Sequence, residues 1–173
     1  MQVIDRGTVF TAQLETDSQS CAFPGICVLP SGRWICSFRA APTKQATTGQ
    51  HVLITWSDDH GQSWSEPTSP FAPTDVDGKP GLFRGAYLAA LGANRILASI
   101  YWVDHSDPSL PLFNEETEGL LDSRIFIAHS EDGGATWCKP EIVDTSPFNV
   151  PTPITGPILR LPNGELGCQF ELN

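Results

Sequence analysis

The sequence lacks the features by which membrane, metal-binding and disulfide-rich proteins are recognised. No apolar run is long enough to span a bilayer, and no long stretch has apolar residues at helical spacing. The five cysteines are odd in number and have no CxxC spacing, so neither a zinc site nor a full disulfide framework is predicted. HExxH, GxSxG and phosphate-binding glycine motifs are also missing. We therefore expect neither a metal ion nor a cofactor.

Basic residues are scarce as well. Ten Lys and Arg face 20 Asp and Glu, which gives a formal net charge of -10. Such a charge repels phosphate backbones and anionic bilayers, so nucleic acids and membranes are not expected partners. The N-terminus has no basic start followed by an apolar run, and no Asn-x-Ser/Thr acceptor occurs. We predict a cytoplasmic location, and secretion of a longer precursor stays open.

Turn-forming residues are plentiful. Fifteen Gly and fifteen Pro are spread along 173 residues, of which 40% are apolar. This composition is typical of short elements joined by many turns, and it predicts an all-β protein.

A short acidic loop closed by tryptophan occurs twice. "SDDHGQSW" covers 57–64 and "SEDGGATW" covers 130–137, 73 residues later (130 − 57). The Asp can accept hydrogen bonds from loop amides and from the Ser or Thr hydroxyl. Gly allows a backbone angle that other residues avoid, and Trp can fill the gap between neighbouring sheets. We interpret the loop as a structural element of the fold. Its residues are Ser57, Asp59, Gly61, Ser63 and Trp64 in the first copy and Ser130, Asp132, Gly134, Thr136 and Trp137 in the second.

A second pattern occurs three times, as "VLPSGRWICSF", "ALGANRILASI" and "RLPNGELGCQF". A turn residue between two apolar runs predicts a β-hairpin. Together the two patterns give four antiparallel strands per repeat, which is a β-propeller blade. We predict a lead-in strand over 1–21, blades over 22–66 and 84–143, and half a blade over 154–173.

The pattern S-x-D-x-G-x-[ST]-W resembles the Asp-box, or BNR repeat, of the sialidase (neuraminidase) superfamily. The resemblance implies a six-bladed propeller of which this chain supplies about two and a half blades. The remaining blades would come from a longer chain or from a partner subunit. It also implies a glycoside hydrolase of the exo-α-sialidase type that acts on or recognises a glycan. The alternative is a non-catalytic Asp-box propeller that serves as a carbohydrate- or protein-binding scaffold.

In sialidases the active site lies on the face opposite the Asp-boxes. The loop "VDHSDPSLPLFNEETEGLLDS" would lie on that face, and irregular loops of this length are often functional. The alternative is a solvated acidic loop that only covers the rim. Sialidases also carry a Phe/Tyr-Arg-Ile-Pro motif whose Arg binds the substrate carboxylate. Phe83-Arg84 matches its first half, whereas Gly85-Ala86 replaces Ile-Pro.

Arg84 is therefore the candidate carboxylate ligand, because a guanidinium can donate two parallel hydrogen bonds. Its alternative is an ion pair with an acidic rim residue. By the resemblance, an Asp of the long loop would be the acid/base, for which we expect a raised pKa. Asp107 fits best by position, and Asp104 and Asp122 are also eligible. His105 and Asp122 are further candidates for substrate binding, although Asp122 could simply flank the third strand.

Overall fold

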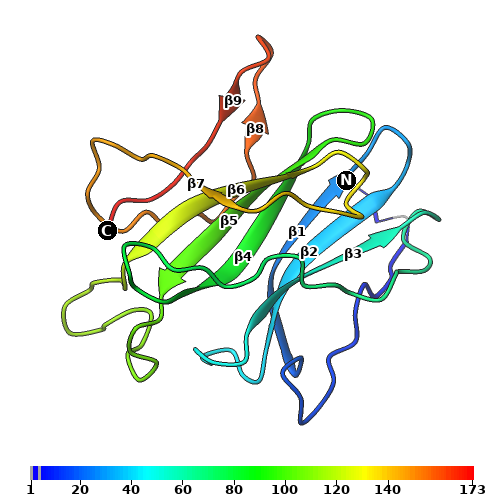
Figure 1. The fold of residues 1–173 in the computed structure, drawn as a ribbon. Coiled ribbons are helices and arrows are strands. Elements are labelled where there is room, and N and C mark those ends of the chain that lie inside the picture. Colours follow the sequence, from blue (N-terminus) through cyan, green and yellow to red (C-terminus); the bar gives the residue numbers. More distant parts are fainter. Residues whose placement is uncertain (1, 4) are drawn as a thin grey trace.

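The computed structural model describes residues 2, 3 and 5–173, and these residues form antiparallel β-sheets and no helix (Figure 1). The prediction of an all-β protein is confirmed. Accordingly, no described segment is a helix long and apolar enough to cross a membrane. The strands are β1 Ser20–Val28, β2 Trp34–Ala41, β3 His51–Ser57, β4 Gly81–Ala90, β5 Ile96–Asp104, β6 Ser123–Ser130, β7 Glu141–Ile142, β8 Leu159–Arg160 and β9 Leu166–Gly167.

The strands form three consecutive sheets, in the orders β1-β2-β3, β4-β5-β6-β7 and β8-β9. Within each sheet, every strand pairs antiparallel with its neighbour in sequence. The first sheet has no fourth strand, but Thr68 forms an isolated antiparallel bridge with Ile54 where the second sheet has β7. The long central strands β2 and β5 are buried along most of their length.

The first two strands of each sheet are joined by the same kind of turn. The turn is closed by a backbone hydrogen bond in which the first residue donates its amide to the carbonyl four residues ahead. This bond is 2.9 Å at Leu29, 2.8 Å at Leu91 and 2.8 Å at Leu161. Gly32 and Gly164 have φ angles of 91° and 87°, a region that favours glycine. The threefold sequence pattern therefore corresponds to three equivalent hairpins.

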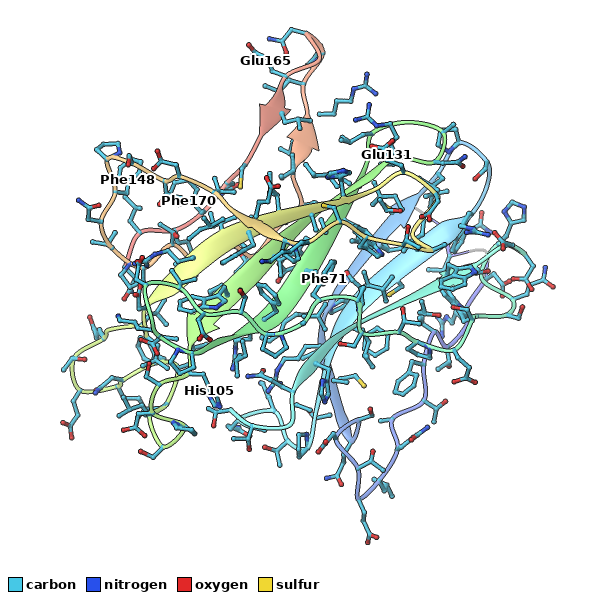
Figure 2. The ribbon with its side chains drawn as sticks, in the orientation of Figure 1. Phe71, His105, Glu131, Phe148, Glu165 and Phe170 are labelled. Carbon is cyan, nitrogen blue, oxygen red and sulfur yellow. The ribbon has the colours of Figure 1, made fainter. Side chains whose placement is uncertain are left out.

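The main core lies between the first and second sheets, whose strands β1 and β4 run side by side (Figure 1). Ile35 and Ile54 from the first sheet and Ile100 and Trp102 from the second are fully buried there. Phe71, from the connection between the sheets, lies in the same core (Figure 2). Burying several side chains of this size, each worth about 1.5–3 kcal/mol, makes this contact the main stabilising layer.

The described part of the predicted lead-in strand is not a strand. Of the described residues in 1–21, only Ser20 and Cys21 are extended in a sheet, as the start of β1. Met1 and Ile4 lie outside the described residues. Val9 and Phe10 nevertheless pack on the first sheet, and the rings of Phe10 and Phe38 are 5.2 Å apart. The segment is held by these apolar contacts and not by a ladder of backbone hydrogen bonds.

Both acidic loops form a closed set of hydrogen bonds. In the first, Asp59 accepts the Ser63 hydroxyl at 2.5 Å, the Ser63 amide at 2.9 Å and the Ser57 hydroxyl at 2.7 Å. In the second, Asp132 accepts the Thr136 hydroxyl at 2.6 Å, the Thr136 amide at 2.9 Å and the Ser130 hydroxyl at 2.8 Å. These hydrogen bonds lower the pKa of each Asp to about 2. The bond from the hydroxyl of Ser63 or Thr136 has the largest effect.

Candidate functional site

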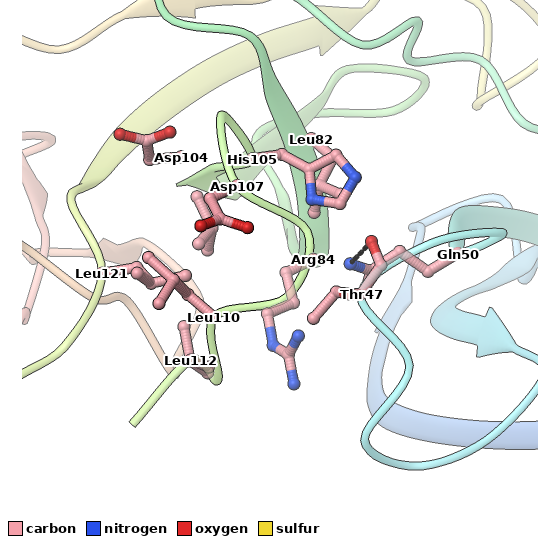
Figure 3. Close-up of a pocket in the computed structure, with 11 residues that line it drawn as sticks. Thr47, Gln50, Leu82, Arg84, Asp104, His105, Asp107, Leu110, Leu112 and Leu121 are labelled. Atoms are coloured by element: carbon pink, nitrogen blue, oxygen red, sulfur yellow. Dashed lines mark hydrogen bonds between the residues drawn. The ribbon is translucent and has the colours of Figure 1, made fainter. Parts of the chain in front are cut away.

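A hollow opens where the loop between β2 and β3 meets the loop between β5 and β6 (Figure 3). Its interior is tight, with a volume of about 10 Å³, which is room for about one water molecule. The Thr47 hydroxyl donates to the Pro108 carbonyl at 2.8 Å and so joins the two loops. The lining residues are Thr47, Gln50, Leu82, Arg84, Val103, Asp104, His105, Asp107, Leu110, Leu112 and Leu121. The hollow thus brings together four of the predicted site residues, Arg84 from β4 and Asp104, His105 and Asp107 from the end of β5 and the loop after it.

Arg84 enters the hollow from a β-bulge in β4. Phe83 pairs with Trp102 and Gly85 pairs with Tyr101, so Arg84 is the extra residue between two rungs of the ladder. Only 9% of Arg84 is exposed, and its Nε has no hydrogen-bond partner among the described residues. No ion pair involves Arg84 in that part of the chain, so the alternative of a rim ion pair is not realised there.

Burial lowers the pKa of the Arg84 guanidinium, and the neighbouring Tyr101 partly offsets this effect. A buried charge without a counter-ion is costly, and proteins rarely keep one that has no partner. Tyr87 and Tyr101 are themselves half-buried strand residues whose pKa values are raised by burial.

A second buried arginine lies behind the wall of the hollow. Arg39 is fully buried in β2, and its Nε donates to Gln50 Oε1 at 2.5 Å. Its two terminal nitrogens donate to the carbonyls of Lys44 and Ala46, at 3.2 and 2.6 Å. Burial, and then the positive charge of Arg84, lower the pKa of Arg39 to about 10. Among the described residues, Arg39 therefore has only neutral oxygen atoms as partners, and Arg84 Nε has none.

Sequence reasoning missed Arg39, Gln50 and Thr47. One signal was present, because Arg39 is the single charged residue of the apolar strand "WICSFRAA". A charge in the middle of a buried strand needs partners, and the following loop supplies them. Which loop atoms do so depends on the conformation of that loop, and no local sequence pattern predicts it.

Asp104 and Asp107 both line the hollow, but the raised pKa expected for an acid catalyst is wrong for both. Burial alone would raise the pKa of Asp104, yet hydrogen bonds from Ser106 and the charge of Lys79, 3.5 Å away, together lower it. Asp107 is exposed, and the Ser109 hydroxyl and amide, at 2.6 and 2.9 Å, lower its pKa. Each is therefore a carboxylate that already has local donors.

Of the other two candidates, His105 lines the hollow and Asp122 does not. His105 lines the hollow beside Asp104, and its amide donates to the Pro80 carbonyl at 2.8 Å (Figure 3). Asp122 lies directly before β6, 3.2 Å from Lys79 Nζ, and it also pairs with Arg124. Among the residues described, no group of three or more His, Cys, Asp or Glu is placed to hold a metal ion.

Comparison with known proteins gives a structural match only. No family model and no curated protein matches the sequence. Among solved structures, the chain is similar to the Hadza microbial sialidase Hz136, with a TM-score of 0.67 and 18% identity over 87% of this chain. The chain spans 32% of the length of that sialidase. The fold is sialidase-like.

A protein of unknown function from Dyadobacter fermentans also matches, at 18% identity over 84% of this chain and 55% of that one. Its TM-score of 0.35 is too low to compare the two folds further.

Proposed function

We propose that an acidic sugar binds at the mouth of the hollow, with its carboxylate on Arg84, and that the chain is part of a sialidase-like glycan-recognising propeller. The observation that carries this proposal is the buried guanidinium that lines the hollow and has no carboxylate partner in the described part of the chain. A ligand carboxylate would supply the missing counter-charge with two charge-assisted hydrogen bonds. In a chain with a net charge of -10, an uncompensated positive site of this kind is conspicuous.

The propeller part of the proposal is supported by two uncovered apolar faces. Ile26 and Val28 of β1 are 55% and 51% exposed, and Leu159 and Leu166 of the last hairpin are 58% and 47% exposed. Faces of this kind usually mark an interaction surface. Further blades, from a longer chain or from a partner subunit, would cover both, and the similarity to one third of a sialidase agrees with this.

In the hydrolase form of the proposal, Asp104 handles the proton. It is less exposed than Asp107 and belongs to the end of β5, whereas Asp107 is tied to Ser109 in the loop. The non-catalytic scaffold is favoured by a different observation, namely that the pKa values of both carboxylates are lowered. An acid that is ionised near neutral pH cannot donate a proton to a glycosidic oxygen.

The test compares an acidic sugar with its neutral ester. The affinity of the chain for N-acetylneuraminic acid and for its methyl ester would be measured by NMR titration. We expect the acid to bind more tightly, and Arg84→Met to weaken its binding by about 10- to 100-fold, which is the range for charge-assisted hydrogen bonds. Equal binding of acid and ester, or full binding by Arg84→Met, would refute the proposal.

Arg95→Met is the matched control. Arg95 is exposed in the turn between β4 and β5, where it pairs with Glu131, so its loss changes the net charge equally without touching the hollow. Its affinity for the acid should equal that of the unaltered chain. Hydrolysis of a fluorogenic sialoside that is lost in Asp104→Asn would support the hydrolase. Binding without any turnover would support the scaffold.

A further inference from the structure

A thiol and an imidazole lie in contact beside the second Asp-box, at the end of the sheet opposite the hollow. Cys138 Sγ is 3.1 Å from His129 Nδ1, and the same sulfur accepts the His129 amide at 3.1 Å. The Cys138 amide donates to the His129 carbonyl at 2.9 Å, which fixes the two residues opposite each other. The imidazole is exposed and the cysteine is half-buried.

The first sheet contains the same arrangement without the thiol. Ser65 and Trp56 stand 73 residues before Cys138 and His129 (138 − 65 and 129 − 56). The Ser65 hydroxyl accepts the Trp56 amide at 3.2 Å, and the Ser65 amide donates to the Trp56 carbonyl at 2.9 Å. A hydroxyl is therefore sufficient to accept the backbone amide at this position. The cysteine and the histidine add an acid–base pair that the structural task does not require.

The other four cysteines lack this environment. Burial raises the pKa of Cys21, Cys27, Cys36 and Cys168, to about 11 for Cys27 and for Cys36. A thiol with a raised pKa is a poor nucleophile at neutral pH because the thiolate is the reacting species. Cys138 also borders a hollow lined by Pro70, Pro73, Thr74 and Lys139, through which a small molecule can approach.

We propose that Cys138 is an oxidation site of this protein, with His129 as its base and a peroxide as its substrate. The imidazole takes the thiol proton, which leaves a thiolate beside an imidazolium. The thiolate attacks one peroxide oxygen, so that the S–O bond forms while the O–O bond breaks. The departing hydroxide takes the proton from the imidazolium and leaves as water. The sulfur ends as a sulfenic acid, two electrons more oxidised, and the peroxide is reduced by the same two electrons.

The test follows each cysteine separately. The folded chain would be treated with hydrogen peroxide at neutral pH, and peptide mass spectrometry would measure oxygen gained at each of the five cysteines over time. We expect Cys138 to be oxidised first. His129→Gln keeps the backbone amide but removes the ring, and it should slow Cys138 oxidation by roughly three- to tenfold. A free thiol is only a few per cent thiolate near pH 7, and part of the gain from ionisation is offset by lower nucleophilicity.

Two further measurements separate chemistry from access. Iodoacetamide alkylation should show the same order of cysteines and the same slowing in His129→Gln. The thiolate absorbance of Cys138 is measured as the difference between the ultraviolet spectra of the unaltered chain and of Cys138→Ser, and we expect it to be present. The difference between the spectra of His129→Gln and of the double variant His129→Gln/Cys138→Ser should lack it. We expect Cys138→Ser to fold, because Ser65 occupies the equivalent position in the first sheet. If Cys138 reacts no faster than the other cysteines, or if His129→Gln leaves its rate unchanged, the proposal is wrong.

Discussion

The two Asp-box turns have nearly identical hydrogen bonds but different surroundings. Corresponding donor–acceptor distances at Asp59 and Asp132 agree within about 0.1 Å. Trp137, however, packs on the main core between the sheets, with its ring 5.4 Å from that of Phe71. Trp64 packs on a smaller cluster with Val9 and Phe10, which lie in no strand. The turn is thus a fixed local unit, and the contribution of its tryptophan to stability depends on what that tryptophan packs against.

The largest expected difference between the turns is in the tryptophans. Trp137→Ala should lower the free energy of unfolding by about 3 kcal/mol, because it removes a large ring from the contact between two sheets. Trp64→Ala should cost only about 1–2 kcal/mol, because part of its packing is with a segment that lacks a backbone ladder. Urea unfolding of both variants checks this order. Equal losses would show that the N-terminal segment is held as firmly as the second sheet.

The two aspartates should behave alike as the pH falls. Each has a folded-state pKa of about 2, below its ordinary value of 3.8, so each contributes stability above pH 4 that is lost as the pH falls towards 2. Asp59→Asn and Asp132→Asn should each be less stable at pH 5 and should each flatten the decline between pH 4 and pH 2. Unfolding monitored at a series of pH values measures the slopes. A slope unchanged in one variant alone would break the equivalence of the turns.

The smallest expected effect concerns the residue that precedes the glycine shared by the two loops. His60 and Gly133 are equivalent, with φ angles of 60° and 74°. Gly133→Ala should cost about 1 kcal/mol, because a side chain in this region is strained. His60→Gly should change stability by only a few tenths of a kcal/mol, since the strain it relieves is offset by the greater freedom of the unfolded chain. Thermal unfolding of the two variants is the measurement, and opposite signs would contradict the comparison.

The sequence predicted the turns well because their hydrogen bonds join residues at most four positions apart. The hairpins followed for the same reason, from Gly or Asn between two apolar runs. The protonation of Asp107 was misjudged although a local signal was present, because Ser109 two positions ahead is a natural donor to its carboxylate. The burial of Arg84 and the partners of Arg39 could not be predicted, since they depend on loops that meet only in the folded chain.

The bulge that carries Arg84 interrupts the regular alternation of β4 at one residue. A residue in a regular rung belongs to one layer of the sheet, and changing it disturbs whatever that layer packs against. The ladder resumes at Gly85, so β4 keeps its pairing with β5 on both sides of Arg84. The first strand of the first sheet also shifts register towards the same end, between Ala22 and Gly25, with Phe23 and Pro24 in the gap. Each of the first two sheets therefore carries an irregular residue or pair near the start of its first strand, while the pairing on both sides is kept.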